Sequence, residues 1–153
     1  VGPDFPVWVR LDSEEMHTPG GIVMEEALKT AKLCEELGMN AISVSAYARL
    51  PTGTAFTDAP IPQKQNAYRD FAKQFKKAVS LPIISAGRWE LDDAADALNK
   101  GEIDFVAMGR KLLAEPEIAN KLQANAAQDV RPCIYCYACV SEIFLFRSAS
   151  KTR

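Results

Sequence analysis

Short apolar runs alternate with longer amphipathic segments along most of this chain, and this alternation limits the folds that it can adopt. The apolar runs predict buried strands at 5–11, 41–45, 81–85 and 103–108. Segments with helical spacing of apolar residues follow them at about 24–37, 65–79, 91–100 and 116–124. Polar stretches at 12–21 and 46–62 predict loops after the first two strands. Four successive strand–helix units predict an α/β protein with a parallel sheet.

Four such units can form a small open sheet or one half of an eight-stranded barrel. A Gly-Arg motif that is repeated after two successive strands favours the barrel. The third predicted strand ends in Ala86-Gly87-Arg88, and the fourth ends in Met108-Gly109-Arg110. In each, a glycine lets the backbone approach a ligand and an arginine follows. Barrels of this kind often bind phosphate after their seventh and eighth strands. In that case the strand at 5–11 is the fifth, and four strands are missing.

Three cysteines at two-residue spacing, Cys133, Cys136 and Cys139, follow the last predicted helix. This spacing lets thiolates converge on a soft metal or an iron–sulfur cluster. Residues 140–153 contain no further cysteine to complete a four-thiolate shell. Structural thiols or a zinc site remain the alternative, although the only histidine, His17, is far away in sequence.

Charge and hydropathy exclude several classes of function. The 18 basic and 20 acidic residues nearly balance, and no basic run favours nucleic acid or an anionic membrane surface. No apolar stretch approaches the roughly 18 residues of a spanning helix, and the first residues do not resemble a signal peptide. Clustered rather than paired cysteines suit a reducing compartment, so we expect a cytoplasmic protein.

Three segments, 2–11, 81–88 and 104–116, resemble the fifth, seventh and eighth strand regions of the old yellow enzyme superfamily. The cysteine cluster makes the chain similar to the iron–sulfur branch, which includes 2,4-dienoyl-CoA reductase, trimethylamine dehydrogenase and 2-enoate reductase. The resemblance implies a (β/α)8 TIM-barrel type fold of which only the C-terminal four units are present. It assigns residues 1–128 to an FMN-binding half-barrel and 129–153 to a truncated iron–sulfur segment.

The resemblance also implies roles for individual residues. Arg10 matches an arginine at the N1/O2 edge of FMN, where a cation stabilises the reduced flavin. The segments Ala86-Gly87-Arg88 and Met108-Gly109-Arg110 match those that hold the FMN phosphate. The three cysteines match ligands of a [4Fe-4S] cluster that relays electrons to and from FMN. A fourth cysteine would be expected between residue 151 and a position just beyond 153.

Two departures from the resemblance affect the chemistry. Residues 45–54 contain no histidine, which one dienoyl-CoA reductase branch uses as its acid, so Tyr47 is the obvious proton donor. The N-terminal half of the barrel is absent, as is the C-terminal FAD/NAD-binding portion of the larger relatives.

The implied parent enzyme is an NAD(P)H-dependent flavin reductase that acts on the activated C=C bond of an enoate, enone or enoyl thioester. Hydride would pass from flavin N5 to the β-carbon, and an acid would protonate the α-carbon. We expect the isolated chain to be inactive or to self-associate, because a half-barrel exposes two sheet edges. The alternatives are an amine dehydrogenase of the same family, a metal-stabilised binding module without enzymatic activity, and a half-barrel that binds phosphate by itself.

Overall fold

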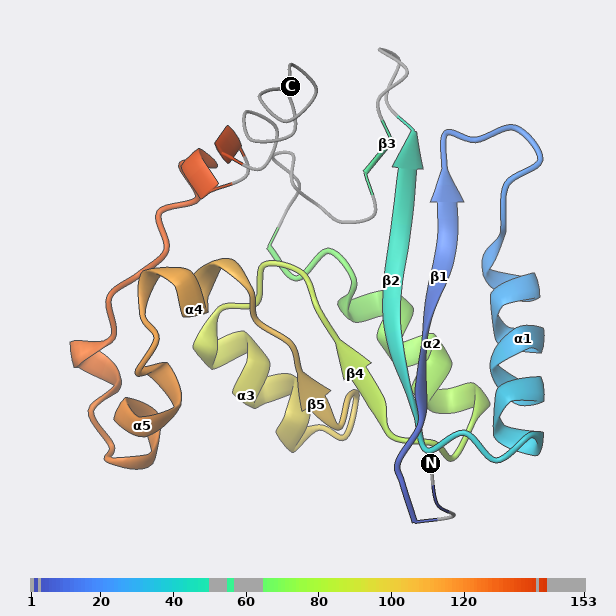
Figure 1. Cartoon of the computed structure of the whole chain (residues 1–153), viewed down its shortest axis with the longest axis horizontal. Coiled ribbons are helices and arrows are strands. Elements are labelled where there is room, and N and C mark those ends of the chain that lie inside the picture. Colours follow the sequence, from blue (N-terminus) through green and yellow to red (C-terminus); the bar gives the residue numbers. More distant parts are fainter. Residues whose placement is uncertain (1, 3, 50–54, 57–64, 140, 143–153) are drawn as a thin grey trace. The chain divides into compact units, whose positions relative to one another are not determined.

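A computed structural model describes residues 2, 4–49, 55–56, 65–139 and 141–142 of the chain. The chain forms two compact units, Val1–Ala107 and Met108–Arg153. The first unit contains β1 (Trp8–Met16), α1 (Met24–Glu36), β2 (Ala41–Arg49), β3 (Ala55–Phe56), α2 (Arg69–Ala78), β4 (Ile83–Ser85), α3 (Leu91–Asn99) and β5 (Phe105–Val106) (Figure 1). The second contains α4 (Arg110–Ala114), α5 (Ile118–Gln123) and a 3-10 turn at Ala127–Asp129. No described helix has the length and apolarity needed to cross a membrane.

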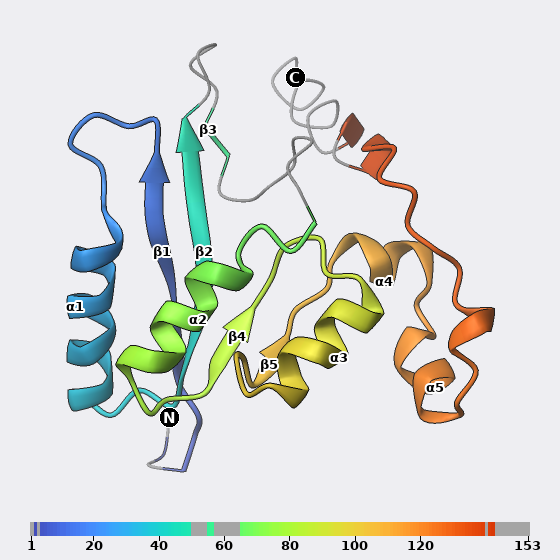
Figure 2. The ribbon, with the colours of Figure 1, turned by 180° about the vertical axis from the view of Figure 1, so that it is seen from behind.

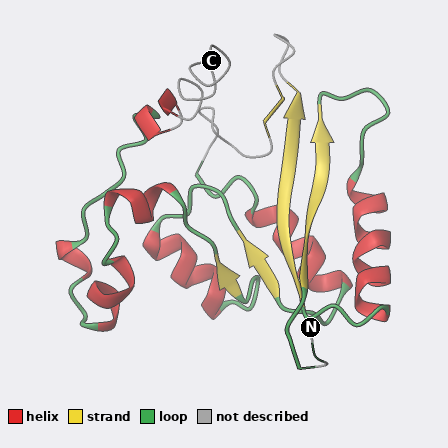
Figure 3. Ribbon diagram, in the orientation of Figure 1, coloured by secondary structure: helices red, strands yellow, loops and turns green. Residues whose placement is uncertain are grey.

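The sheet of the first unit has the strand order β1-β2-β4-β5, and every pair along this order is parallel. The short β3 pairs with β2 in the antiparallel sense. Strands and helices alternate as Figure 3 shows, which confirms the predicted α/β class and the four parallel strands. Because the strands are parallel, their carboxyl ends lie at one end of the sheet.

Helices cover one face of this sheet. Helices α2 and α3 lie behind the strands in Figure 1 and in front of them in Figure 2. Beneath them, Ile42, Val44 and Ile83 are fully buried, together with Phe75 of α2. Each such side chain contributes on the order of 2 kcal/mol by leaving water. This layer is the hydrophobic core of the unit.

The opposite face of the sheet is open, since no helix covers it within the described part of this unit. The pairing places Arg10, Ser43, Ile84 and Phe105 in one row across the four strands. Phe105 is 57% exposed, and Trp8, on the same face as Arg10, is 58% exposed. Two large aromatic side chains are thus left in solvent at the two edge strands.

Strands β1 and β2 are longer than predicted, so the predicted loops at 12–21 and 46–62 begin too early. The polar residues that indicated a loop bond to one another across the strand pair. The Ser13 hydroxyl donates to the Ser45 carbonyl at 2.8 Å, and the Ser45 hydroxyl donates to Asp12. A register shift between Asp12 and Glu15 accommodates the extension. The rest of the second predicted loop lies largely outside the described residues.

Other element boundaries differ from the prediction by a few residues. The strands β4 and β5 are shorter than predicted, and residues 110–114, where no helix was predicted, form the helix α4. Pro82 has no N–H for the sheet ladder, so β4 begins at the next residue, although the Pro82 carbonyl still accepts from Ile42 N–H at 3.0 Å.

Half-buried ion pairs join α2 to the segments that follow it. Arg69 donates from Nε to Glu102 at 2.6 Å and from a terminal nitrogen to Asp96 at 2.7 Å. The Arg69 guanidinium holds the pKa of the Glu102 carboxyl below its usual value. Lys76 binds both Asp104 oxygens at 2.8 Å, and Asp104 also accepts the Ile83 N–H at 2.7 Å. These contacts fix α2 to the start of β4 and to the approach to β5.

We expect Glu102→Gln to lower the free energy of unfolding by about 1–2 kcal/mol at pH 7, because it removes a charged partner of Arg69 in a half-buried site. The lowered pKa means that the stabilisation is present above the ordinary value of 4.5 and fades as the pH falls below it. Urea unfolding followed by circular dichroism at pH 7 and pH 3.5 measures both effects.

Glu25→Gln is the matched control, since Glu25 pairs with Lys29 on an exposed helix face and the change should cost much less stability than Glu102→Gln. Equal losses for the two variants would contradict the special role of Glu102.

Candidate functional site

Arg10 lies in β1, paired with Ser43 of β2, and its side chain is exposed on the open face of the sheet. The neighbouring strands contribute a serine and an isoleucine to the same row, so the guanidinium is the cationic group of that row. This position suits contact with an electron-rich ligand edge. The assignment of Arg10 to FMN stays a prediction.

Ala86-Gly87-Arg88 turns sharply at the carboxyl end of β4. Gly87 has φ +97° and Arg88 has φ +46°, so two successive residues have left-handed conformations. A Cβ on Gly87 would come within 3.0 Å of the Tyr68 ring. Tyr68 is itself buried and donates its hydroxyl to the Ala46 carbonyl at 3.4 Å. The glycine is therefore required for two reasons, backbone conformation and close packing.

Met108-Gly109-Arg110 leads into α4 and differs from the first Gly-Arg pair in its geometry. Gly109 is the N-cap with φ −101°, and a Cβ there would have nothing within 4 Å. Its carbonyl accepts the Leu113 N–H at 3.1 Å, which closes the first turn of α4. The two pairs belong to different compact units. The repeated Gly-Arg motif thus corresponds to two different local structures.

Arg110 packs against two tyrosines of the cysteine segment. Its guanidinium carbon lies 5.6 Å from the ring centroid of Tyr135 and 5.3 Å from that of Tyr137. The ammonium of Lys111, a residue only 9% exposed, lies 5.6 Å from the Tyr135 ring. These are cation–π distances, so the first turn of α4 contacts the loop that carries Cys136.

Both tyrosines have a strained backbone. Tyr135 has φ +52° and Tyr137 has φ +61°, one on each side of Cys136. The left-handed conformation costs a residue other than glycine about 1–2 kcal/mol. A cation–π contact contributes about 0.5–2 kcal/mol, depending on how far water is excluded. The contacts with Arg110 and Lys111 are therefore large enough to offset much of this strain.

A buried carboxylate holds the segment that precedes the cysteines. Glu115, 3% exposed, accepts a short hydrogen bond from the Lys121 ammonium and the Arg131 N–H at 3.3 Å. Lys121 also donates to the Asp129 carbonyl at 2.9 Å. The Lys121 ammonium and the N–H groups of Arg131 and Glu117 hold the pKa of Glu115 below its usual value. Glu115 and Lys121 thereby attach residues 129–131 to the end of α4.

Cys133, Cys136 and Cys139 are free thiols, of which Cys136 is exposed and the other two are half-buried. Within the described residues, no three His, Cys, Asp or Glu side chains are placed to hold a metal ion together. The donor set suits iron or another soft metal, and left-handed residues that turn the backbone around a ligand are found at iron–sulfur sites. The chemistry of the segment fits such a group, and binding requires the three thiols to be drawn together.

Tyr47 lies near the end of β2 and pairs with Glu15 of β1. Its side chain is half-buried at the carboxyl end of the sheet. This is the end at which Ala86-Gly87-Arg88 also lies, within the same compact unit. The role of Tyr47 as a proton donor stays a prediction.

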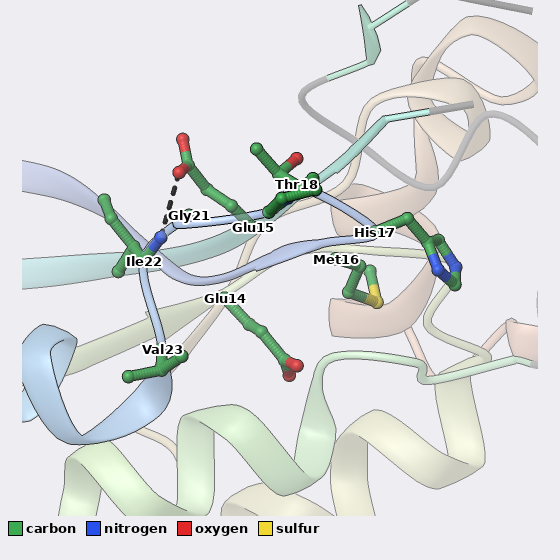
Figure 4. A pocket seen from close by; sticks show the side chains of 9 residues that line it. Glu14, Glu15, Met16, His17, Thr18, Gly21, Ile22 and Val23 are labelled. Atoms are coloured by element: carbon green, nitrogen blue, oxygen red, sulfur yellow. Dashed lines mark hydrogen bonds between the residues drawn. The ribbon is translucent and has the colours of Figure 1, made fainter. Parts of the chain in front are cut away.

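An open pocket of about 410 Å³ lies in the loop between β1 and α1 (Figure 4). Glu15 closes one side of it, because its carboxylate accepts the Ile22 N–H at 2.9 Å. His17, with φ +60°, lines the pocket from an exposed position, together with Glu14 and Met16. His17 is therefore a surface residue of this loop and also part of the pocket wall.

The sequence reasoning missed Tyr135, Tyr137, Lys111 and Glu115. The two tyrosines could have been noticed, because each is adjacent to Cys136. The backbone turns more easily at a small or polar residue, so two bulky residues at these positions are unusual. No local pattern identifies Glu115 as an anchor, since Lys121 and Arg131, the partners that it attaches to α4, are 6 and 16 residues further along the chain.

A family model described as the NADH:flavin oxidoreductase / NADH oxidase family matches residues 1–129, most of the chain. The chain belongs to this family. The family assignment confirms the resemblance in the strand segments and places the chain among FMN-linked, NADH-related oxidoreductases.

Individual reductases are similar over nearly the whole chain. A metal reductase of Desulforamulus reducens is 32% identical over 98% of this chain and 22% of its own length. A cinnamate reductase of Clostridium sporogenes is 32% identical over 97% and 24%. A solved 2-naphthoyl-CoA reductase matches with a TM-score of 0.74 and 26% identity over 89% of this chain and 20% of that one. The chain thus spans about a fifth to a quarter of these relatives.

We expect Gly87→Ala to lower the free energy of unfolding by about 2 kcal/mol, because φ +97° strains the alanine and its Cβ meets Tyr68. Gly109→Ala is the control: it makes the same chemical change where φ is negative and space is open, and should cost about 0.5 kcal/mol or less. Urea unfolding followed by circular dichroism compares them, and a similar cost at both positions would refute the structural difference between the two pairs.

We expect Glu115→Ala to reduce the hydrogen-exchange protection of the Arg131 amide about tenfold, because the acceptor of this amide is removed. Glu117→Ala removes an exposed acceptor of Asn120 nearby and should leave that protection unchanged. In the unmodified chain, the contact should weaken as the pH falls through the lowered pKa of Glu115. Amide exchange measured by NMR is the readout, and unchanged protection in Glu115→Ala would disprove the attachment.

Proposed function

We infer that this chain is part of an FMN- and [4Fe-4S]-dependent NADH:flavin oxidoreductase that reduces an activated C=C bond. The observation that carries the proposal is the family match over residues 1–129, followed directly by three free thiols. The reductases of cinnamate and 2-naphthoyl-CoA among the similar proteins act on unsaturated carboxylic acid derivatives by name. They support an enoate or enoyl thioester as the substrate class.

Bound FMN would supply a hydride from its N5 atom to the β-carbon of the substrate. The chain's own contribution is to hold the cofactor and to move a proton. Ala86-Gly87-Arg88 and Met108-Gly109-Arg110 would bind the phosphate through main-chain N–H groups and the two guanidiniums. Arg10, on the open face of the sheet, would place positive charge against the pyrimidine edge of the flavin.

Tyr47 would hold the proton that the α-carbon receives, at its phenolic oxygen. Its position at the carboxyl end of β2 supports this role, because α/β proteins bind their ligands at that end. A phenolic O–H is a hydrogen-bond and proton donor, which this role requires.

Cys133, Cys136 and Cys139 would bind three irons of the cluster as thiolates. The fourth ligand would come from elsewhere, since residues 140–153 contain no cysteine. A cluster at this position would exchange single electrons with the flavin in a protein that also holds a further redox partner.

The open face of the sheet would be covered by the rest of an eight-stranded barrel. Trp8 and Phe105 are more than half exposed at the two edge strands, where additional strands would pair and bury them. The limited share of the relatives that this chain spans supports a larger enzyme. An N-terminal half-barrel and a C-terminal FAD/NAD-binding portion are the proposed partners.

Titration with FMN tests the proposed phosphate contacts. We expect the double replacement Arg88→Gln and Arg110→Gln to weaken FMN binding at least about tenfold, since two charge-assisted contacts to a dianion are lost. Quenching of flavin fluorescence at fixed ionic strength measures the affinity.

Arg131→Gln is the matched control, because it removes an exposed arginine outside both Gly-Arg segments and should change FMN affinity less than about twofold. If the double variant bound FMN as the unmodified chain does, the assignment of Arg88 and Arg110 to the phosphate would be wrong.

A further inference from the structure

The loop that carries the cysteines is attached to α4 on both sides of Cys133. Upstream, the Glu115 carboxylate accepts the Arg131 N–H at 3.3 Å. Downstream, the Arg110 guanidinium lies 5.3 Å from the Tyr137 ring and 5.6 Å from the Tyr135 ring. All of these residues belong to the second compact unit. In Figure 1 the segment after α5 runs back towards α4, as these contacts require.

The ring of Tyr137, rather than its hydroxyl, makes the contact. The Tyr137 hydroxyl oxygen is buried and has no hydrogen-bond partner among the described residues. Its ring lies against the guanidinium, where the negative face of the π-system attracts the cation. A bulky residue persists at positive φ when its surroundings hold it there. The contact with Arg110 is such a constraint.

We propose that Arg110 and the rings of Tyr135 and Tyr137 form a clamp that holds the backbone on both sides of Cys136 in its turned course before a metal binds, so that less of the loop has to be ordered when the three thiols are drawn together. Arg110 and the two tyrosines are positioning residues, since none of them supplies a thiolate. The left-handed turns at 135 and 137 set the course of the backbone on both sides of Cys136, and the clamp keeps these turns populated. The metal-binding role rests on the proposed cluster, whereas the clamp itself is a property of the metal-free chain.

Three variants of Tyr137 separate the contribution of the π-system from those of the hydroxyl, the apolar bulk and the backbone strain. Tyr137→Phe keeps the ring and removes the hydroxyl. Tyr137→Leu keeps apolar bulk and removes the π-system. Tyr137→Gly removes the ring and also relieves the backbone strain, because glycine adopts positive φ without cost. The glycine variant therefore separates the loss of the clamp from a simple failure of the loop to reach its conformation.

The first measurement uses the reduced, metal-free 153-residue chain. Alkylation of the half-buried Cys133 by iodoacetamide is followed by mass spectrometry. We expect Tyr137→Phe to react within about twofold of the unmodified chain, and Tyr137→Leu and Tyr137→Gly about five- to tenfold faster, as expected for the loss of one cation–π contact. Equal rates in all four proteins overturn the clamp. Equally fast reaction of Tyr137→Phe and Tyr137→Gly also overturns it, because the hydroxyl would then matter.

The second measurement is the iron bound per chain, and the midpoint potential, after anaerobic reconstitution with ferrous iron and sulfide. The clamp predicts that Tyr137→Phe matches the unmodified chain and that Tyr137→Gly retains at most about half as much iron after gel filtration. Full retention at an unchanged potential in Tyr137→Gly overturns the positioning role. If the unmodified chain binds no iron, its three thiols do not hold a cluster without the fourth ligand proposed to come from elsewhere, and the alkylation rates still decide whether the clamp exists.

Discussion

The register of β2 against its neighbours is the constraint on which the first unit depends. This strand pairs with β1, β3 and β4, and Ile42 and Val44 on its covered face are fully buried. A slip of one residue would move both into solvent and would turn Ser43 into the core. The register therefore fixes which face Arg10 occupies and where Tyr47 lies relative to the end of β4.

In the second unit, the constraint on which the structure depends is the need to compensate buried charges. Glu115 and Lys111 are both almost excluded from water, and an unpartnered charge in such a position is costly. Glu115 is compensated by Lys121 and by main-chain N–H groups, and Lys111 lies against the Tyr135 ring. These requirements bind the short α4, whose two leucines, Leu112 and Leu113, are exposed rather than packed in a core, to the segment that follows it. Within its described residues, the unit is thus held together by polar and cation–π contacts more than by a large core.

The sequence was sufficient to predict the alternation of strands and helices, because burial of a sheet covered by helices requires apolar runs of the kind that occur at 41–45 and 81–85. The ends of β1 and β2 could not be predicted in the same way. Ser13 is fully buried because a partner serine lies 32 positions along the chain, and a local window of sequence does not contain that partner. Trp8 is likewise exposed, although it lies in the apolar run 5–11 that was predicted to be a buried strand.

In the candidate site too, contacts between residues that are distant in sequence could not be predicted. The glycines at 87 and 109 were predicted as equivalent, yet only Gly87 meets a neighbour, since that neighbour, Tyr68, is brought in by α2 packing rather than by the motif. The two-residue spacing alone was enough to single out the three cysteines as candidate ligands. Their attachment to Arg110 could not be predicted, because a cation–π contact has no fixed spacing in sequence.

The unequal strand lengths have a consequence for any molecule that rests on the end of β4. The last residue of β4, Ser85, pairs with Val44, and β2 continues from there to Arg49, accompanied by β1 as far as Met16 (Figure 1). At about 3.3 Å per residue these strands rise roughly 16 Å above the neighbouring strand end. They form a two-stranded wall on one side of that position. Substitutions in this wall leave the backbone turn at Gly87 untouched, so the shape of this side of the strand end can vary without a change in that turn.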